Sequence, residues 1–139
     1  MKLLLDTNVF LEAIHNQPQA MSARRLLNDQ RHELYLSIFS LHSIGVNLMR
    51  KRLAQRWRRF LREMVLSGQV QTLTLPATKL LRIPVMAQQY SLDFDDAYQY
   101  LTAEHFQLTL VSFDKDFDHT PRGRQIPQAI LQITNNPTP

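Results

Sequence analysis

The sequence contains no cysteine and only three glycines among its 139 residues. Without cysteine, neither a disulfide framework nor a thiolate zinc site is possible, and a reducing cytoplasm suits such a chain. The scarcity of glycine excludes a glycine-rich phosphate-binding loop. No apolar run approaches membrane-spanning length, and Asp6 and Asn8 interrupt the opening leucines too soon for a secretory signal. These features predict a soluble cytoplasmic protein whose length is close to the commonest size of a single domain.

Charge is unevenly distributed along the chain, with a formal net charge of +4. Acidic residues dominate from 93 to 118. Basic residues crowd the middle of the chain: Arg50, Lys51, Arg52, Arg56, Arg58, Arg59 and Arg62. A basic segment beside an acidic pocket suits a metal-dependent nuclease, because the bases hold phosphates and the acids hold the metal. Charge alone favours plainer explanations, namely a solvated helix face or a surface that docks an acidic partner.

Hydrophobic patterning predicts short buried strands separated by helices. We expect strands at 2–6, 34–38, 70–75 and 108–112, and an edge strand at 129–133. We expect helices at 9–15, 18–30, 40–52, 55–67, 76–90 with an interruption at Pro84, and 93–105. This alternation predicts an α/β fold with a parallel sheet covered by helices on both faces. It forms one domain over residues 1–134, followed by a frayed tail at 135–139.

Two apolar runs at opposite ends of the chain each lead to an acidic residue. Leu3-Leu4-Leu5 leads to Asp6, and Leu108–Phe113 leads to Asp114. Sites in open α/β sheets form just outside the carboxyl ends of strands, so we expect these two carboxylates to converge. Clustered carboxylates repel unless a cation lies between them, and a hard divalent metal with oxygen ligands is the simplest candidate. A helix N-cap is the plainer role for Asp6, but Thr7 and Asn8 are better placed to cap the helix, which favours a functional role for Asp6.

Three further acidic residues each have a structural and a functional explanation. Asp95 and Asp96 fit the first turn of the 93–105 helix, where the helix dipole favours negative charge, so a structural role competes equally with a functional one. Asp96 borders the apolar face of that helix and is harder to explain by solvation than Asp95. Asp116 follows Asp114 in an Asp-rich segment, for which turn formation is the plainer explanation.

Three segments together resemble the acidic motifs of PIN-domain nucleases, especially the small toxins of VapBC-type toxin–antitoxin pairs. They are Leu4–Asn8, Asp95-Asp96-Ala97 and Leu110–Phe117. The resemblance covers nearly the whole chain and implies a three-layer α/β/α sandwich with a mainly parallel sheet. It also implies a Mg²⁺- or Mn²⁺-dependent endoribonuclease, a homodimer and a small antitoxin partner. It assigns catalysis and metal binding to Asp6, Asp96 and Asp114, a further metal-binding role to Asp116, and supporting roles to Thr7, Asn8, Asp95 and Ser112.

The sequence departs from the family after the second predicted strand. PIN domains usually carry a glutamate on the following helix, but Ser43 stands at this position, beside His42, and no acidic residue occurs from 35 to 62. The candidates to replace the missing carboxylate are Asp95, Asp116 and Glu12. The other outcomes are weak binding of a single metal ion or reduced activity.

These observations leave competing hypotheses. The leading one is metal-dependent hydrolysis of RNA, with the RNA backbone held by Arg50, Lys51, Arg52, Arg56 and Arg59, and with Arg122 and Arg124 as further candidates. The second is a degenerate PIN-like module that binds RNA or a protein partner without cleavage. A receiver-like phosphoacceptor domain is disfavoured, because the first strand ends on a single acid. Trp57 and Phe60 are candidates for antitoxin contact, with core packing as the alternative.

Overall fold

The computed structural model describes residues 1–135 and contains one parallel sheet. The four strands of the described chain are β1 (Lys2–Leu5), β2 (Glu33–Ser37), β3 (Val70–Leu73) and β4 (Thr109–Val111). They lie in the order β3-β2-β1-β4, and each neighbouring pair is parallel. The predicted α/β fold with a parallel sheet is therefore confirmed. In this arrangement the carboxyl ends of β1 and β4 are adjacent.

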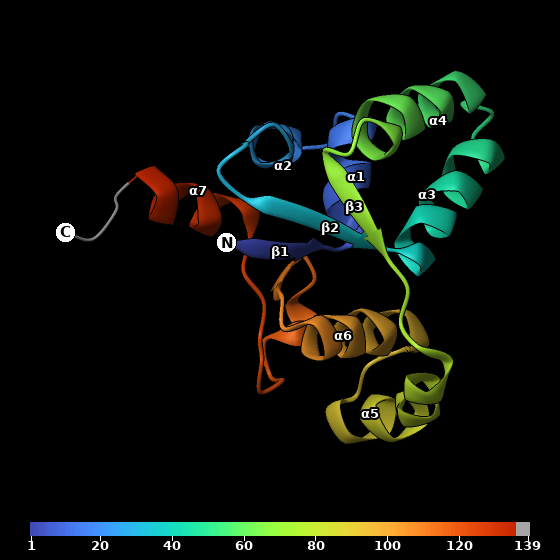
Figure 1. The fold of residues 1–139 in the computed structure, drawn as a ribbon, viewed down its shortest axis with the longest axis vertical. Coiled ribbons are helices and arrows are strands. Elements are labelled where there is room, and N and C mark those ends of the chain that lie inside the picture. Colours follow the sequence, from blue (N-terminus) through green and yellow to red (C-terminus); the bar gives the residue numbers. More distant parts are fainter. Residues whose placement is uncertain (136–139) are drawn as a thin grey trace.

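Helices cover both faces of the sheet (Figure 1). One face carries α1 (Thr7–Ile14), α2 (Ala20–Leu27), α3 (Ile38–Arg50), α4 (Ala54–Phe60), the π-helix η1 (Leu61–Leu66) and α7 (Pro127–Asn135). The other face carries the 3₁₀ helix η2 (Ala77–Arg82), α5 (Ile83–Tyr90), α6 (Phe94–Phe106) and the short 3₁₀ helix η3 (Lys115–Phe117). This is the three-layer sandwich that the resemblance implies. Among the described residues, no helix combines the length and apolar character needed to cross a membrane.

Strand β1 lies at the centre of the sheet and supplies side chains to two hydrophobic cores. Successive side chains of a strand point to opposite faces. Leu3 and Leu5 therefore pack with α1, α2 and α3, whereas Leu4 packs with α5 and α6. All three leucines are fully buried. The apolar run ends abruptly at Asp6, so the chain leaves the core at the carboxyl edge of the sheet.

Three helices begin at or near this edge with a side chain that caps the helix N-terminus. Asp6 accepts a hydrogen bond from the Thr7 backbone N–H at the start of α1. Ser37 caps α3, and Asp93 caps α6 by accepting from the Asp96 backbone N–H. These contacts satisfy N–H groups that a helix terminus leaves without an internal partner. The expectation that Thr7 or Asn8 is better placed to cap this helix is wrong, because Asp6 is the N-cap of α1; this contact does not exclude a second role for Asp6.

The predicted edge strand at 129–133 is wrong, because these residues lie in α7. A short apolar run does not distinguish a strand from a buried helix. Pro127 at the first helical position favours a helix, and Ile130 and Leu131 are buried while Ile133 is exposed. Of the predicted tail, Asn135 ends α7, and residues 136–139 lie outside the described part of the chain.

Candidate metal centre

Asp6 is buried at the carboxyl end of β1, and both of its carboxylate oxygens are hydrogen-bonded. Oδ1 accepts from the Thr7 backbone N–H at 2.8 Å and from Gln99 Nε2 at 2.9 Å. Oδ2 accepts from Ser112 Oγ at 2.7 Å and, at a longer 3.4 Å, from Asn8 Nδ2. A buried carboxylate requires such donors, because burial without partners is costly. Of the four predicted supporting residues, Thr7, Asn8 and Ser112 thus contact Asp6, whereas Asp95 is exposed in the first turn of α6.

Ser112 connects Asp6 to the segment that follows β4. Its hydroxyl donates to Asp6 Oδ2 and accepts from the Asp114 backbone N–H at 2.9 Å. Asn8 strengthens this connection, because its Oδ1 accepts from the Phe113 backbone N–H at 3.2 Å. The ends of β1 and β4 are therefore held together by side chains as well as by strand pairing.

Three carboxylates converge beside Asp6. One oxygen from each of Asp96, Asp114 and Asp116 lies within 4.8 Å of the others. Asp114 Oδ1 also accepts from the Asp116 backbone N–H at 2.8 Å, which fixes the turn into η3. We call Asp96, Asp114 and Asp116 the acidic cluster. Of the three predicted catalytic residues, the structure thus places Asp96 and Asp114 in the cluster with Asp116, whereas Asp6 adjoins it through Ser112.

The electrostatics of the acidic cluster are unfavourable without a cation. Burial, followed by the charges of Asp114, Asp93, Asp6 and Asp116, raises the pKa of Asp96 to about 8. Burial also raises the pKa of Asp6, against the opposing effect of hydrogen bonds from Gln99, Ser112 and Thr7. Raised carboxyl pKa values mean that charge repulsion and lost solvation oppose ionisation. A divalent cation would relieve both effects.

The donor set of the acidic cluster fits a hard cation. It offers carboxylate oxygens alone, with no histidine nitrogen or cysteine sulfur. Oxygen ligands of this kind suit Mg²⁺ or Mn²⁺ better than metals that prefer nitrogen or sulfur. Asp96, Asp114 and Asp116 are thus a set of side chains that could hold one such ion.

Helix α3 brings hydroxyl groups to the site in place of a carboxylate. Ser40 Oγ accepts from Thr7 Oγ1 at 2.9 Å. Ser43 is half-buried one turn later, and His42 is exposed. Among the candidates to replace the missing glutamate, Asp116 lies in the acidic cluster. Glu12 accepts instead from the Gln19 backbone N–H in the segment between α1 and α2.

The basic residues predicted to bind RNA are divided between two places. Arg50, Lys51 and Arg52 are exposed at the end of α3 and in the turn that follows. Arg56 donates to the Ile14 backbone carbonyl at 3.4 Å, and Arg59 pairs with Glu63. Within the described chain, no hydrogen bond or ion pair joins any of these five residues to Asp6 or to the acidic cluster. Their role in binding RNA remains a prediction.

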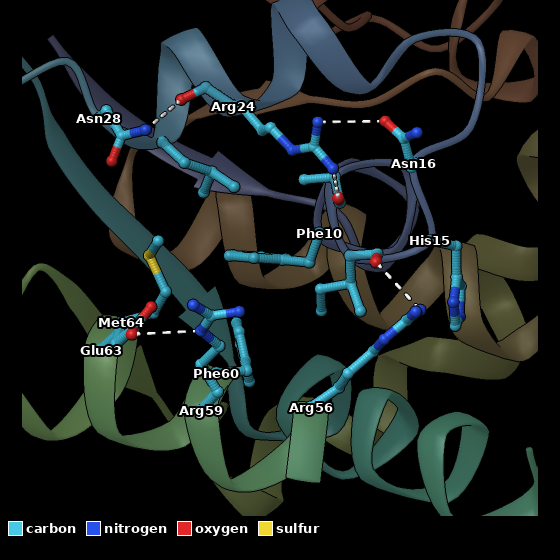
Figure 2. Close-up of a pocket in the computed structure, with 13 residues that line it drawn as sticks. Phe10, His15, Asn16, Arg24, Asn28, Arg56, Arg59, Phe60, Glu63 and Met64 are labelled. Atoms are coloured by element: carbon cyan, nitrogen blue, oxygen red, sulfur yellow. Dashed lines mark hydrogen bonds and ion pairs between the residues drawn. The ribbon is translucent and has the colours of Figure 1, made fainter. Parts of the chain in front are cut away.

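Arg56 and Arg59 border a pocket of about 530 Å³ between α1, α2 and α4. Figure 2 shows Arg24, Arg56 and Arg59 around this pocket, which Phe10, Phe60 and Met64 also line. Phe10 and Phe60 contact each other edge to face, with ring centroids 5.5 Å apart. Phe60 therefore packs in the core and lines the pocket at the same time. The further candidate Arg124 is engaged elsewhere, since it pairs with Asp118 and donates to the Ser112 backbone carbonyl.

Sequence reasoning missed Gln99. It lies in α6 and is 1% exposed, yet its side-chain amide contacts Asp6 directly. One signal was available, because residues three apart on a helix share a face and Gln99 follows Asp96 by three positions. An amide within the otherwise apolar run after Asp96 also needs a buried polar partner.

Comparisons with known proteins agree with this fold. A toxin–antitoxin complex from Klebsiella pneumoniae contains a similar chain, with 22% identity and a TM-score of 0.69 over 90% of this chain and 97% of that chain. VapBC2 from Rickettsia felis, bound to a DNA fragment from its promoter, gives 17% identity and a TM-score of 0.68 over 90% and 97%. Mycobacterium tuberculosis VapC20, a Sarcin-Ricin loop cleaving toxin, gives 17% identity and a TM-score of 0.71 over 86% and 95%.

These identities are low and establish similarity of fold. No match was found among curated proteins. The sequence itself matches the family model of the PIN domain over residues 3–123. This match covers β1 from Leu3 onward, all of β2, β3 and β4, and the acidic cluster. The chain therefore belongs to the PIN-domain family.

Proposed function

We propose that this PIN-domain protein is a Mg²⁺- or Mn²⁺-dependent endoribonuclease and the toxin of a toxin–antitoxin pair. The acidic cluster carries the proposal, because three converging carboxylates at the carboxyl edge of a parallel sheet are suited to a hard divalent ion. Family membership supports it, since PIN domains are usually metal-dependent nucleases. The similar VapC20 is described as a toxin that cleaves the Sarcin-Ricin loop.

All four acidic residues belong to the metal site in this proposal. Asp96, Asp114 and Asp116 hold the ion, and Asp6 is a fourth metal-site carboxylate, whose orientation is fixed by its four donors. A bound Mg²⁺ or Mn²⁺ would supply an activated water and offset the charge that develops on the phosphate. The protein mainly positions the reacting groups, because phosphoryl transfer needs little covalent chemistry from side chains.

The RNA backbone is held by the basic residues of the middle segment in the same proposal. Arg50, Lys51 and Arg52 are exposed, and Arg56 and Arg59 lie farther along the same basic segment. Contacts of this type give affinity with steep salt dependence and little sequence choice. Neutralising Arg50 and Lys51 together should weaken RNA binding and reduce its dependence on salt, which a filter-binding assay at several salt concentrations measures.

Cleavage of RNA by purified protein tests the enzyme proposal. We expect Mn²⁺-dependent cleavage by the wild type that disappears in Asp114→Asn and in excess EDTA. Glu104→Gln is the matched control, because Glu104 pairs with Arg82 on the surface of α6 and lies outside the acidic cluster. Equal cleavage by wild type and Asp114→Asn, or cleavage that persists in EDTA, would contradict the proposal.

A non-cleaving module is the alternative, and the composition of α3 favours it. This helix contributes Ser40 and no carboxylate to the site. The alternative predicts no turnover at millimolar Mn²⁺, with RNA binding that is retained and weakens with salt. Metal-dependent cleavage by the wild type that is absent in Asp114→Asn would exclude it.

We propose that the antitoxin partner docks in the pocket between α1, α2 and α4. The pocket combines an apolar lining, in which Ile14 and Met64 are half-buried beside the buried Phe10 and Phe60, with arginines at its border (Figure 2). A segment with an apolar side chain flanked by acidic residues fits this chemistry. Support for a partner comes from the similar chain in a toxin–antitoxin complex. Co-purification with the product of an adjacent short reading frame, lost in Arg24→Glu/Arg59→Glu, tests the location.

The homodimer implied by the family resemblance is also part of the proposal. Light scattering at several protein concentrations tests it directly. A molecular mass of one chain at every concentration would contradict it.

A further inference from the structure

Gln99 makes three side-chain hydrogen bonds in the interior of the protein. Its Nε2 donates to Asp6 Oδ1 at 2.9 Å and to Ser40 Oγ at 2.7 Å. Its Oε1 accepts from Ser37 Oγ at 2.7 Å. The amide orientation follows from these partners, because an ionised carboxylate only accepts hydrogen bonds. A single side chain on α6 thereby contacts residues that follow β1 and residues at the start of α3.

The two oxygens of the Asp6 carboxylate have different partners. Gln99 and the Thr7 backbone N–H occupy Oδ1. Oδ2 contacts Ser112, whose hydroxyl also accepts from the Asp114 backbone N–H. Oδ2 is therefore the oxygen connected to the acidic cluster, and its contact with Asn8 is long at 3.4 Å. Rotation of the carboxylate would break the Gln99 bond.

Gln99 supplies this constraint without adding charge. Asp6 and the three residues of the acidic cluster already bring four carboxylates together, and Asp114 repels Asp6. A neutral amide donor stabilises the ionised form of Asp6. The same amide reaches Ser37 and Ser40, so α3 is tied to the site through hydroxyl groups.

We propose that Gln99 is a positioning residue that holds the Asp6 carboxylate with Oδ2 toward the metal and couples α3 to the metal site. The inference rests on the proposed metal-dependent function. Hydrogen-bonding partners of metal-site carboxylates orient them, and their loss typically weakens metal binding by about 10–100-fold. Gln99 acts through Asp6 and needs no contact with RNA or metal.

Metal affinity and folding stability separate this role from simple core packing. Gln99→Met keeps the side-chain length and removes every hydrogen bond. Thr102→Val is the matched control, because Thr102 is also buried in α6 and donates only to the Tyr98 backbone carbonyl. We expect both variants to unfold more easily in urea. We expect only Gln99→Met to bind Mn²⁺ more weakly by calorimetry, by about tenfold or more, and Thr102→Val to bind within about twofold of wild type.

A measurement on the wild-type protein keeps the test decisive if Gln99→Met does not fold. The side-chain amide resonances of Gln99 should shift on titration with Mg²⁺, following the same saturation curve as the Asp116 backbone amide. Those of Gln69, which donates to the Leu27 backbone carbonyl, should not move. Static Gln99 resonances during Mg²⁺ saturation, or wild-type Mn²⁺ affinity in Gln99→Met, would overturn the inference while leaving the proposed function intact. Absence of Mn²⁺ binding by the wild type would overturn both.

Discussion

Metal binding to the acidic cluster should release protons at neutral pH. Asp96 is central to this prediction, because burial and four neighbouring carboxylates raise its pKa to about 8. At pH 7 such a group is about 0.9 protonated, since the protonated and ionised forms stand at about ten to one. A metal ion binds the ionised carboxylate. Each bound Mn²⁺ should therefore displace about 0.9 proton from Asp96 at pH 7, about 0.5 at pH 8 and about 0.1 at pH 9.

Isothermal titration calorimetry in buffers of different ionisation enthalpy measures this number. The observed enthalpy should change with the buffer at pH 7 and become nearly independent of it at pH 9. Asp96→Asn removes the proton source, so any residual Mn²⁺ binding by that variant should lack this contribution. Mn²⁺ binding by the wild type at pH 7 without proton release would refute the reasoning, because it would mean that Asp96 is already ionised or does not bind the ion.

Three further predictions concern stability and charge. Without metal, the free energy of unfolding should fall as pH rises from about 5 to 8. The reason is that the pKa of Asp96 is about 8 in the folded state and 3.8 in the unfolded state, so the folded state binds more protons over this range. Urea unfolding at several pH values should show a weaker dependence of this free energy on pH in Asp96→Asn. Ser43→Glu should tighten Mn²⁺ binding by about tenfold by adding a carboxylate one turn after Ser40, and unchanged affinity by calorimetry would contradict this. Arg24→Leu should cost about 1 kcal/mol in urea unfolding, because its guanidinium bonds the Ala13 carbonyl at the end of α1; the exposed Arg25→Leu should cost less.

Four of the five predicted strands are present, and these strands and the metal-site candidates could be predicted because their signals are local. Leu3-Leu4-Leu5 is a short apolar run, and these three residues of β1 are indeed fully buried in the centre of the sheet. Strands that end at one edge bring their following residues together. That geometry is enough to bring Asp6, Ser112 and Asp114 into one network.

Other features depend on side-chain geometry and could not be predicted from the sequence. The contact between Asp6 and Gln99 joins residues 93 positions apart. The spacing of Gln99 from Asp96 places the two on one helix face, but it does not identify Asp6 as the partner. The sequence also does not indicate that Asp116 belongs to the acidic cluster and that Asp6 adjoins it through Ser112. Both positions depend on the turn after β4. The contact of Arg56 with the end of α1 could not be predicted either, because it forms only when α1 and α4 pack together.

Diffraction from a crystal soaked in Mn²⁺, with an anomalous difference map, is the most direct test of the metal centre. We predict an anomalous peak in contact with carboxylate oxygens of Asp96, Asp114 and Asp116, close to Oδ2 of Asp6. A saturating soak that leaves no peak among these side chains, or that places Mn²⁺ at another surface, would contradict the proposed site and the nuclease mechanism built on it.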